Sequence, residues 1–334
     1  MDTLSLLQLA RTLVDIDSTT GQEGDCGRWL AAYLRRRGFR VEEIPVTDDR
    51  FNVLATIDPP QVMLSTHFDC VPPFVPSREE GGILYGRGAC DAKGIVAVQI
   101  AALERLRSQG VRDVGALFVV GEERGSDGAR AANAVPNACR FLINGEPTDS
   151  RLGLATRGAL RVKLTAAGRA AHSAFPETGE SAIERLLDEL VRLRSIAWPT
   201  REPLGRTHYT IGLIGGGIAP NVIPPHAEAE VMFRTVGPAA DVLSLLAPVD
   251  NGVRIDVVLE VPAMTLATVP GFETAVFSFT TDIPFLDRWG MPLLFGPGSI
   301  LVAHTDHEQV PIAELHTAVD RYVELATALL AQEA

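Results

Sequence analysis

The stretch Gln61-Val-Met-Leu-Ser-Thr-His-Phe-Asp69 is a short apolar run that ends in a histidine and an aspartate. Its length and composition predict a buried β-strand. The apolar runs Val114–Val120 and Phe141–Ile143 predict two more strands covered on both faces of a sheet. A mostly buried helix is expected at Lys93–Gln109, between the first two of these strands. Because helices and strands alternate, we predict that this part of the chain is α/β.

A different pattern begins near residue 156. Leu160, Val162 and Leu164 alternate with polar residues, which predicts a strand with one buried face. Ser181–Arg194 has the apolar spacing of an amphipathic helix. Strands are also expected near 207–214, 227–234 and 253–260, with a helix near 238–247. This β-α-β-β-α-β order is typical of the ferredoxin-like arrangement.

After this segment the chain returns to α/β character, with a strand at Pro292–Phe295 and a helix at Ile312–Gln332. We therefore predict one discontinuous α/β domain, residues 1–155 and 262–334. It is interrupted by a smaller α+β domain, residues 156–261.

The composition excludes several classes of partner. Acidic residues outnumber basic ones by 42 to 30, a formal charge of −12, which disfavours nucleic acid and anionic membranes. The four cysteines contain no C-x-x-C pair and are too few for a disulfide framework, so we expect a reducing cytoplasm. There is no apolar run of about 18 residues and no secretory pattern at the N-terminus.

Acidic and histidine residues follow four of the predicted strands, where open α/β sheets bind ligands. Asp91 lies in a separate glycine-rich loop, Gly86–Gly94. Imidazole and carboxylate ligands suit zinc, cobalt or manganese, and two such metals could activate a water. No G-x-S-x-G motif supports a serine nucleophile. The residues that follow the strands are His67, Asp69, Glu122, Glu123, Glu146 and His304.

Most of these residues also have a structural interpretation, which spacing alone leaves open. His67 could be a strand-end histidine that hydrogen-bonds Asp69. Asp91 could cap the helix that begins at Lys93. Glu122 and Glu123 could form a solvated acidic turn, and Glu146 could be a turn residue before proline.

Seven motifs, taken together and in order, resemble those of the M20 metallopeptidase family. This family includes acetylornithine deacetylase, succinyl-diaminopimelate desuccinylase, aminoacylase and glutamate carboxypeptidase. The resemblance implies a zinc-exopeptidase-like catalytic domain, a mixed sheet flanked by helices, interrupted by a ferredoxin-like lid and dimerisation domain. The motifs are Ser65–Pro72, Gly86–Gly94, Val120–Ser126, Gly145–Thr148, Ala171–Pro176, Gly215–Pro224 and Ala303–Glu308.

The resemblance also implies roles for the site residues. Two divalent ions are expected, one bound by His67 and Glu146 and the other by Glu123 and His304. Asp91 would bridge them and precede a cis peptide bond to Ala92. Asp69 would orient His67. Glu122 would be the general base that takes a proton from the bridging water.

Four residues of the inserted domain are implied to act on the substrate. His172 would reach the active site of the partner subunit and stabilise the oxyanion, with Asn221 nearby. Arg234 would hold the substrate carboxylate, and Arg157 is a further candidate for that task. His172 could instead be an ordinary residue near a helix start, and Arg234 a strand-edge charge.

Together these features predict a cytoplasmic, dimeric, two-metal amidohydrolase that removes an N-acyl group from an amino acid. The segment Phe295-Gly-Pro-Gly-Ser-Ile300 most resembles the corresponding segment of acetylornithine deacetylase. This resemblance favours an N-acetyl amino acid such as N-acetylornithine as the substrate. The alternative is a dipeptidase or carboxypeptidase acting on short peptides. A non-catalytic binding protein on the same fold is the alternative from another class.

Overall fold

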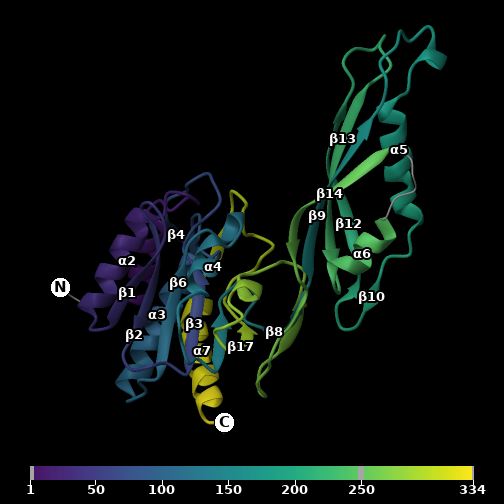
Figure 1. The fold of residues 1–334 in the computed structure, drawn as a ribbon. Helices are drawn as coiled ribbons and strands as arrows, with labels where there is room; N and C mark the ends of the chain where they lie inside the picture. The colour runs from purple at the N-terminus through teal and green to yellow at the C-terminus, as the bar shows by residue number, and fades with distance from the viewer. Residues whose placement is uncertain (1–3, 247–251, 333–334) are drawn as a thin grey trace. The chain divides into compact units, whose positions relative to one another are not determined.

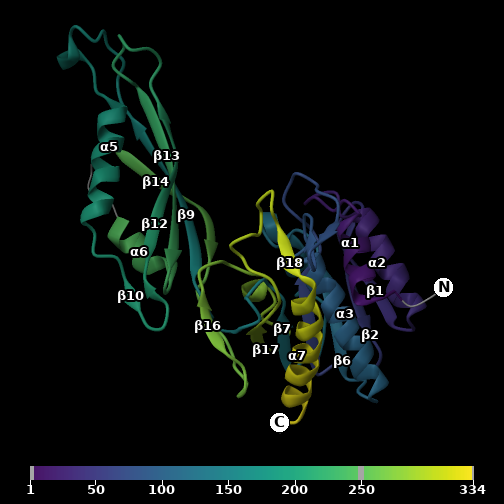
Figure 2. The same cartoon turned by 180° about the vertical axis from the view of Figure 1, so that it is seen from behind.

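The computed structural model describes residues 4–246 and 252–332, and the chain divides into two compact units (Figures 1 and 2). The first unit comprises residues 1–154, 266–275 and 281–334. The second comprises residues 155–265 and 276–280. The short segment 276–280, which joins the second unit, was not anticipated from the sequence. The predicted fold class, an α/β domain interrupted by a ferredoxin-like α+β domain, is confirmed.

Within the described residues of the first unit, six strands form a mixed sheet in the order β1-β2-β6-β3-β7-β17. The last four strands in this order are mutually parallel, whereas β1 and β2 form an antiparallel hairpin whose β2 pairs with β6. The carboxyl ends of the parallel strands therefore meet at one edge. The bounds are β1 (Arg40–Thr47), β2 (Arg50–Thr56), β3 (Val62–His67), β6 (Val114–Val119), β7 (Phe141–Asn144) and β17 (Met291–Leu294).

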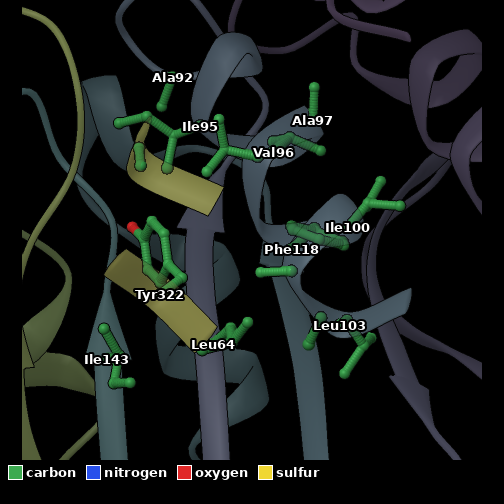
Figure 3. Close-up of a cluster of buried hydrophobic side chains, with 14 of the residues drawn as sticks. Leu64, Ala92, Ile95, Val96, Ala97, Ile100, Leu103, Phe118, Ile143 and Tyr322 are labelled. Carbon is green, nitrogen blue, oxygen red and sulfur yellow. The ribbon is translucent and has the colours of Figure 1, made fainter. Parts of the chain in front are cut away.

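Hydrophobic side chains cover both faces of this sheet, which is why its central strands are continuous apolar runs. Leu64 faces a cluster that includes Ile95 and Ile100 of the buried helix α3 and Tyr322 of α7 (Figure 3). The neighbouring Met63 faces the opposite way, toward a cluster that includes Trp289. The helices of this unit are α1 (Leu6–Val14), α2 (Gly24–Arg36), α3 (Lys93–Ser108), α4 (Asp127–Ala132) and α7 (Ile312–Leu330).

The sheet of the second unit has the antiparallel order β12-β13-β9-β14, as expected for a ferredoxin-like fold. Helices α5 and α6 pack on one face of it. On strand β12, at the edge, Ile211, Leu213 and Ile214 are exposed. The bounds are β9 (Gly158–Ala167), α5 (Ala182–Arg192), β12 (His208–Gly216), β13 (His226–Thr235), α6 (Ala239–Leu246) and β14 (Val253–Val261).

Shorter strands and single turns connect these elements. None of the helices in the described ranges has an apolar stretch long enough to cross a lipid bilayer. The short strands are β4 (Arg78–Glu80), β5 (Ile83–Tyr85), β8 (Leu152–Thr156), β10 (Thr200–Arg201), β11 (Gly205–Arg206), β15 (Met264–Thr265), β16 (Thr274–Phe277) and β18 (Gln309–Pro311).

Candidate metal centre and active site

The carboxylate of Asp91 lies between two imidazole rings. His67 Nε2 is 3.0 Å from Asp91 Oδ1, and His304 Nε2 is 3.2 Å from Asp91 Oδ2. Burial alone would raise the pKa of Asp91, but hydrogen bonds from His304 and His67 hold it well below its ordinary value. No side chain caps the N-terminus of α3, so the interpretation of Asp91 as a helix cap is wrong. The Asp91–Ala92 peptide bond is cis, as expected.

Asp69 orients the ring of His67 from its other side. His67 Nδ1 lies 3.1 Å from the Asp69 carbonyl oxygen and 3.4 Å from Asp69 Oδ1. A hydrogen bond from Nδ1 leaves Nε2 directed toward Asp91, which is the arrangement of a metal-binding histidine with a supporting carboxylate. Although burial would lower the pKa of His67, its hydrogen bonds to Asp69 and Asp91 raise it well above the ordinary value.

The same Asp69 carboxylate also holds the loop that follows β6. It accepts hydrogen bonds from the backbone N–H groups of Glu122, at 3.1 Å, and Glu123, at 3.3 Å. The hydroxyl of Thr20 donates a third bond, at 2.9 Å. One buried carboxylate thus fixes both the first histidine and the start of the acidic loop, and Thr20 is a contributor that no sequence motif indicated.

The remaining acidic residues complete two groups around Asp91. Glu123 Oε1 lies 2.9 Å from His304 Nε2, and Glu146 Oε2 lies 3.9 Å from His67 Nε2. Hydrogen bonds to Asp91 and Glu123 raise the pKa of His304 to about 10. The structure therefore brings together the five residues expected to bind metal, in the two expected groups.

These residues fit a divalent metal centre. Ligand atoms of His67, Asp91 and Glu123 all lie within 4.8 Å of one another. Oε1 of Glu146 is buried and has no hydrogen-bond partner among the described residues, which leaves it available as a ligand. Zinc, cobalt and manganese all bind imidazole nitrogen and carboxylate oxygen, so these ligands are compatible with each of the three metals.

Glu122 lies in an acidic environment beside these ligands. Burial and the negative charge of Glu146 raise its pKa well above the ordinary value, and Asp282 adds to the effect. Asp282 itself is 1% exposed, and burial raises its pKa to about 7. Sequence analysis missed Asp282 because Thr281-Asp282 belongs to no motif that we had identified.

His172 and Asn221 lie together in the second unit. The backbone N–H of Ser173 donates to the carbonyl of Asn221 at 3.0 Å, and both functional side chains are exposed. His172 Nδ1 accepts a hydrogen bond from the N–H of Ala174 at 3.1 Å. In a neutral ring this bond assigns the proton to Nε2, so that the exposed nitrogen is a hydrogen-bond donor.

The two predicted substrate arginines also lie in the second unit, and a histidine joins them. Arg157 Nη1 is 2.6 Å from His208 Nδ1, and His208 lies opposite Arg234 in the β12–β13 ladder. Arg234 is half-buried, with no carboxylate partner in the described ranges, and burial lowers its pKa. None of the seven sequence motifs contains His208. Only the strand register reveals that it belongs with the arginines.

Comparison with known proteins agrees with this geometry. The family model "Peptidase family M20/M25/M40" matches residues 63–328. The chain belongs to the M20 peptidase family. A probable carboxypeptidase of Aspergillus fumigatus is 36% identical over 98% of this chain and 88% of its own length. The M20 assignment makes the protein a hydrolase of peptides.

Solved structures share the M20 fold. A tripeptidase from Staphylococcus aureus has a TM-score of 0.84 at 19% identity and covers 98% of both chains. The YXEP protein of Bacillus subtilis, described as a dinuclear metal binding peptidase of the M20 family, has a TM-score of 0.69 at 16% identity. That match covers 97% of both chains.

The contact between Arg157 and His208 generates a prediction. Burial and the neighbouring charge of Arg157 lower the pKa of His208 below its ordinary value of 6.5. The variant Arg157→Gln should therefore raise this pKa toward 6.5, measured by NMR titration of the imidazole. Because the folded protein disfavours the charged ring, acidification below about pH 6.5 should also cost stability in the wild type.

The variant Arg201→Gln is the matched control, since Arg201 is an exposed arginine of the same unit that pairs with Asp241. It should leave the titration of His208 unchanged. An unaltered midpoint in Arg157→Gln would show that the charge of Arg157 does not act on His208.

Proposed function

We propose that this M20 peptidase is a two-metal exopeptidase that removes the C-terminal residue from short peptides. The observation that carries the proposal is the Asp91 carboxylate, each of whose oxygens faces a different histidine. The curated relative at 36% identity, named a probable carboxypeptidase, supports the substrate class. When bound, two divalent ions would lower the pKa of a water and polarise the scissile carbonyl.

Glu122 is the proposed general base. It takes a proton from the attacking water and later gives that proton to the leaving nitrogen. A carboxylate in water is a weak base, so the raised pKa of Glu122 suits a group that must hold a proton between the two steps. Its neighbour Glu123 faces His304 instead. The two adjacent glutamates are therefore proposed to have different roles, Glu122 as the base and Glu123 as a metal ligand.

The residues of the second unit are proposed to bind the substrate. The half-buried guanidinium of Arg234 would form an ion pair with the terminal carboxylate of a peptide. Arg157, which lies beside His208, is a second positive charge that could bind the same carboxylate. The exposed Nε2–H of His172 would donate a hydrogen bond to the oxyanion, and Asn221 lies next to it.

We further propose that the protein acts as a homodimer in which His172 of the partner subunit serves each active site. The exposed apolar side chains on edge strand β12 support association, because an unpaired edge of this kind favours pairing with another chain.

Hydrolysis of N-acyl amino acids such as N-acetylornithine remains a second candidate, because both reactions cleave an amide beside a free carboxylate. The segment Phe295–Ile300 favoured it in the sequence. A Cβ at Gly298, where φ is +84°, would lie 2.6 Å from Cys90 Cβ. Close packing of the turn against Cys90, next to Asp91, therefore accounts for the glycine at 298, and the turn need not indicate an acyl-group substrate. The relative named a probable carboxypeptidase favours the peptidase.

The deciding experiment is a hydrolysis panel on metal-stripped protein supplied with zinc, cobalt or manganese. Short peptides and N-acetyl amino acids, including N-acetylornithine, are compared by amine release. We expect metal-dependent release of the C-terminal residue from peptides and at least tenfold lower kcat/KM on acetyl amino acids. The reverse ranking would establish the deacylase, and no turnover despite bound metal would favour a binding protein.

The role of Glu122 can be tested separately. The variant Glu122→Gln should bind metal within a few-fold of wild type and lose about 10²–10⁴-fold in kcat, the range for removal of a general base. The control Glu43→Gln, which removes an exposed partner of Arg35, should keep full activity. Near-normal turnover by Glu122→Gln would exclude this residue as the base.

The role of His172 across the dimer predicts complementation. The variant His172→Ala should remain dimeric and lose about 10²–10³-fold in kcat, as for an oxyanion donor. Mixing it with Glu122→Gln makes hybrid dimers, half of the population, each with one intact site. About a quarter of wild-type activity should therefore return if the dimer is twofold symmetric. No recovery after subunit exchange would mean that His172 acts within its own chain, and full activity of His172→Ala alone would mean that it has no catalytic role.

A further inference from the structure

The loop that carries Asp91 encloses a carboxylate of the same chain. The backbone N–H groups of Gly88 and Asp91 point at Oε1 of Glu308, at 2.8 and 3.2 Å, and that of Cys90 at 3.4 Å. Converging N–H groups of this kind form an anion-binding concavity. Gly88 has φ of +86°, and a Cβ there would lie 2.8 Å from Cys70 Sγ, so the loop needs glycine at this position.

The second oxygen of Glu308 is paired with Arg87. Arg87 Nη1 is 2.7 Å from Glu308 Oε2, and the two side chains are 3% and 2% exposed. The guanidinium also donates to the carbonyl oxygens of Thr305, at 3.2 Å, and Pro73, at 3.3 Å. A buried ion pair is tolerated when further hydrogen bonds accompany the charge pairing, and here both the guanidinium and the carboxylate make such bonds.

These contacts join two segments that are far apart in the sequence. Glu308 follows His304 by four residues, and its hydrogen bonds end on the backbone of Asp91. His304 itself has φ of +63°, a left-handed conformation that is costly for a histidine and persists only where the surrounding structure imposes it. The anchored Glu308 provides such a constraint close to His304.

We propose that Glu308 is a positioning residue that fixes Asp91 and His304 relative to each other, and thereby sets the metal affinity of the group formed by Asp91, Glu123 and His304. The inference rests on the proposed two-metal function. Glu308 reaches this group through the backbone N–H of Asp91 and through the chain that leads to His304, while Arg87 neutralises its charge. His67 lies on β3, a different segment from the two that Glu308 joins, and its ring is oriented by Asp69, so the ion held by His67 and Glu146 should respond less to loss of Glu308.

The test is the variant Glu308→Gln, which has the shape of the native side chain but places an amide where a charged oxygen meets Arg87. Metal-stripped protein is titrated with Co2+, followed by calorimetry and visible absorption. We expect one ion to bind with affinity within about threefold of wild type and the other to bind about 10–100-fold more weakly, as for supporting residues of metal sites. Excess Co2+ should restore kcat with KM unchanged.

The matched control is Glu104→Gln, which breaks the partly buried Arg37–Glu104 pair near the other end of α3. It should change thermal stability without changing either Co2+ affinity. If Glu308→Gln likewise lowers only the melting temperature and binds both ions as wild type does, Glu308 is merely structural and the inference is overturned.

Two further outcomes are informative. If Glu308→Gln does not fold, the variant Glu308→Asp is tested in its place. It keeps the negative charge, but its side chain is one methylene shorter and holds the carboxylate farther from the backbone N–H groups of the loop. The same selective loss of one ion supports the inference, and wild-type affinities in folded Glu308→Asp overturn it. Wild-type protein that binds no Co2+ would contradict the two-metal function and the inference together. Two ions bound equally well by wild type and variant would contradict the inference alone.

Discussion

The shared carboxylate of Asp91 is the contact on which the site depends. It lies at the start of α3, 5% exposed, with an imidazole nitrogen near each oxygen. A buried anion in this position is stable only because positive or metal-binding groups surround it. Asp69 and Glu308 hold its two sides, one through His67 and the other through the backbone. Burial and the neighbouring acidic residues raise the pKa values of Glu122 and Glu146, so the surrounding protein groups disfavour the charged forms of these two side chains, unlike that of Asp91.

Much of this site could be predicted because it follows from the direction of strands. Strands β3, β6, β7 and β17 are parallel, so residues just beyond their carboxyl ends must meet at one edge. His67, Glu123, Glu146 and His304 are such residues. The alternation of apolar residues in β9 likewise predicted the ferredoxin-like unit, because one face of its sheet is covered and the other is not. The local patterns of apolar and polar residues therefore predicted both the sheet of the first unit and the fold of the second.

Contacts between distant segments could not be predicted in the same way. Asp282 and Thr20 approach the site from loops with no periodicity, and their effects depend on burial that only the folded chain creates. His208 joins Arg157 and Arg234 through strand register, since a shift of one residue would place it on the other face of the sheet. The sequence motifs could not predict the substrate class either. They describe the metal ligands, and the same ligands can serve hydrolysis of any amide that lies beside a carboxylate.

The interrupted first unit has a consequence for biosynthesis. His67, Asp91, Glu123 and Glu146 precede the second unit in the chain, whereas His304 and Glu308 follow it. Domains tend to fold as the chain emerges from the ribosome, so the ferredoxin-like unit can form while the catalytic unit still lacks β17 and α7. The nascent protein would thus be unable to hydrolyse peptides until its last segment is made. A chain that terminates early would carry most of the ligands and none of the activity.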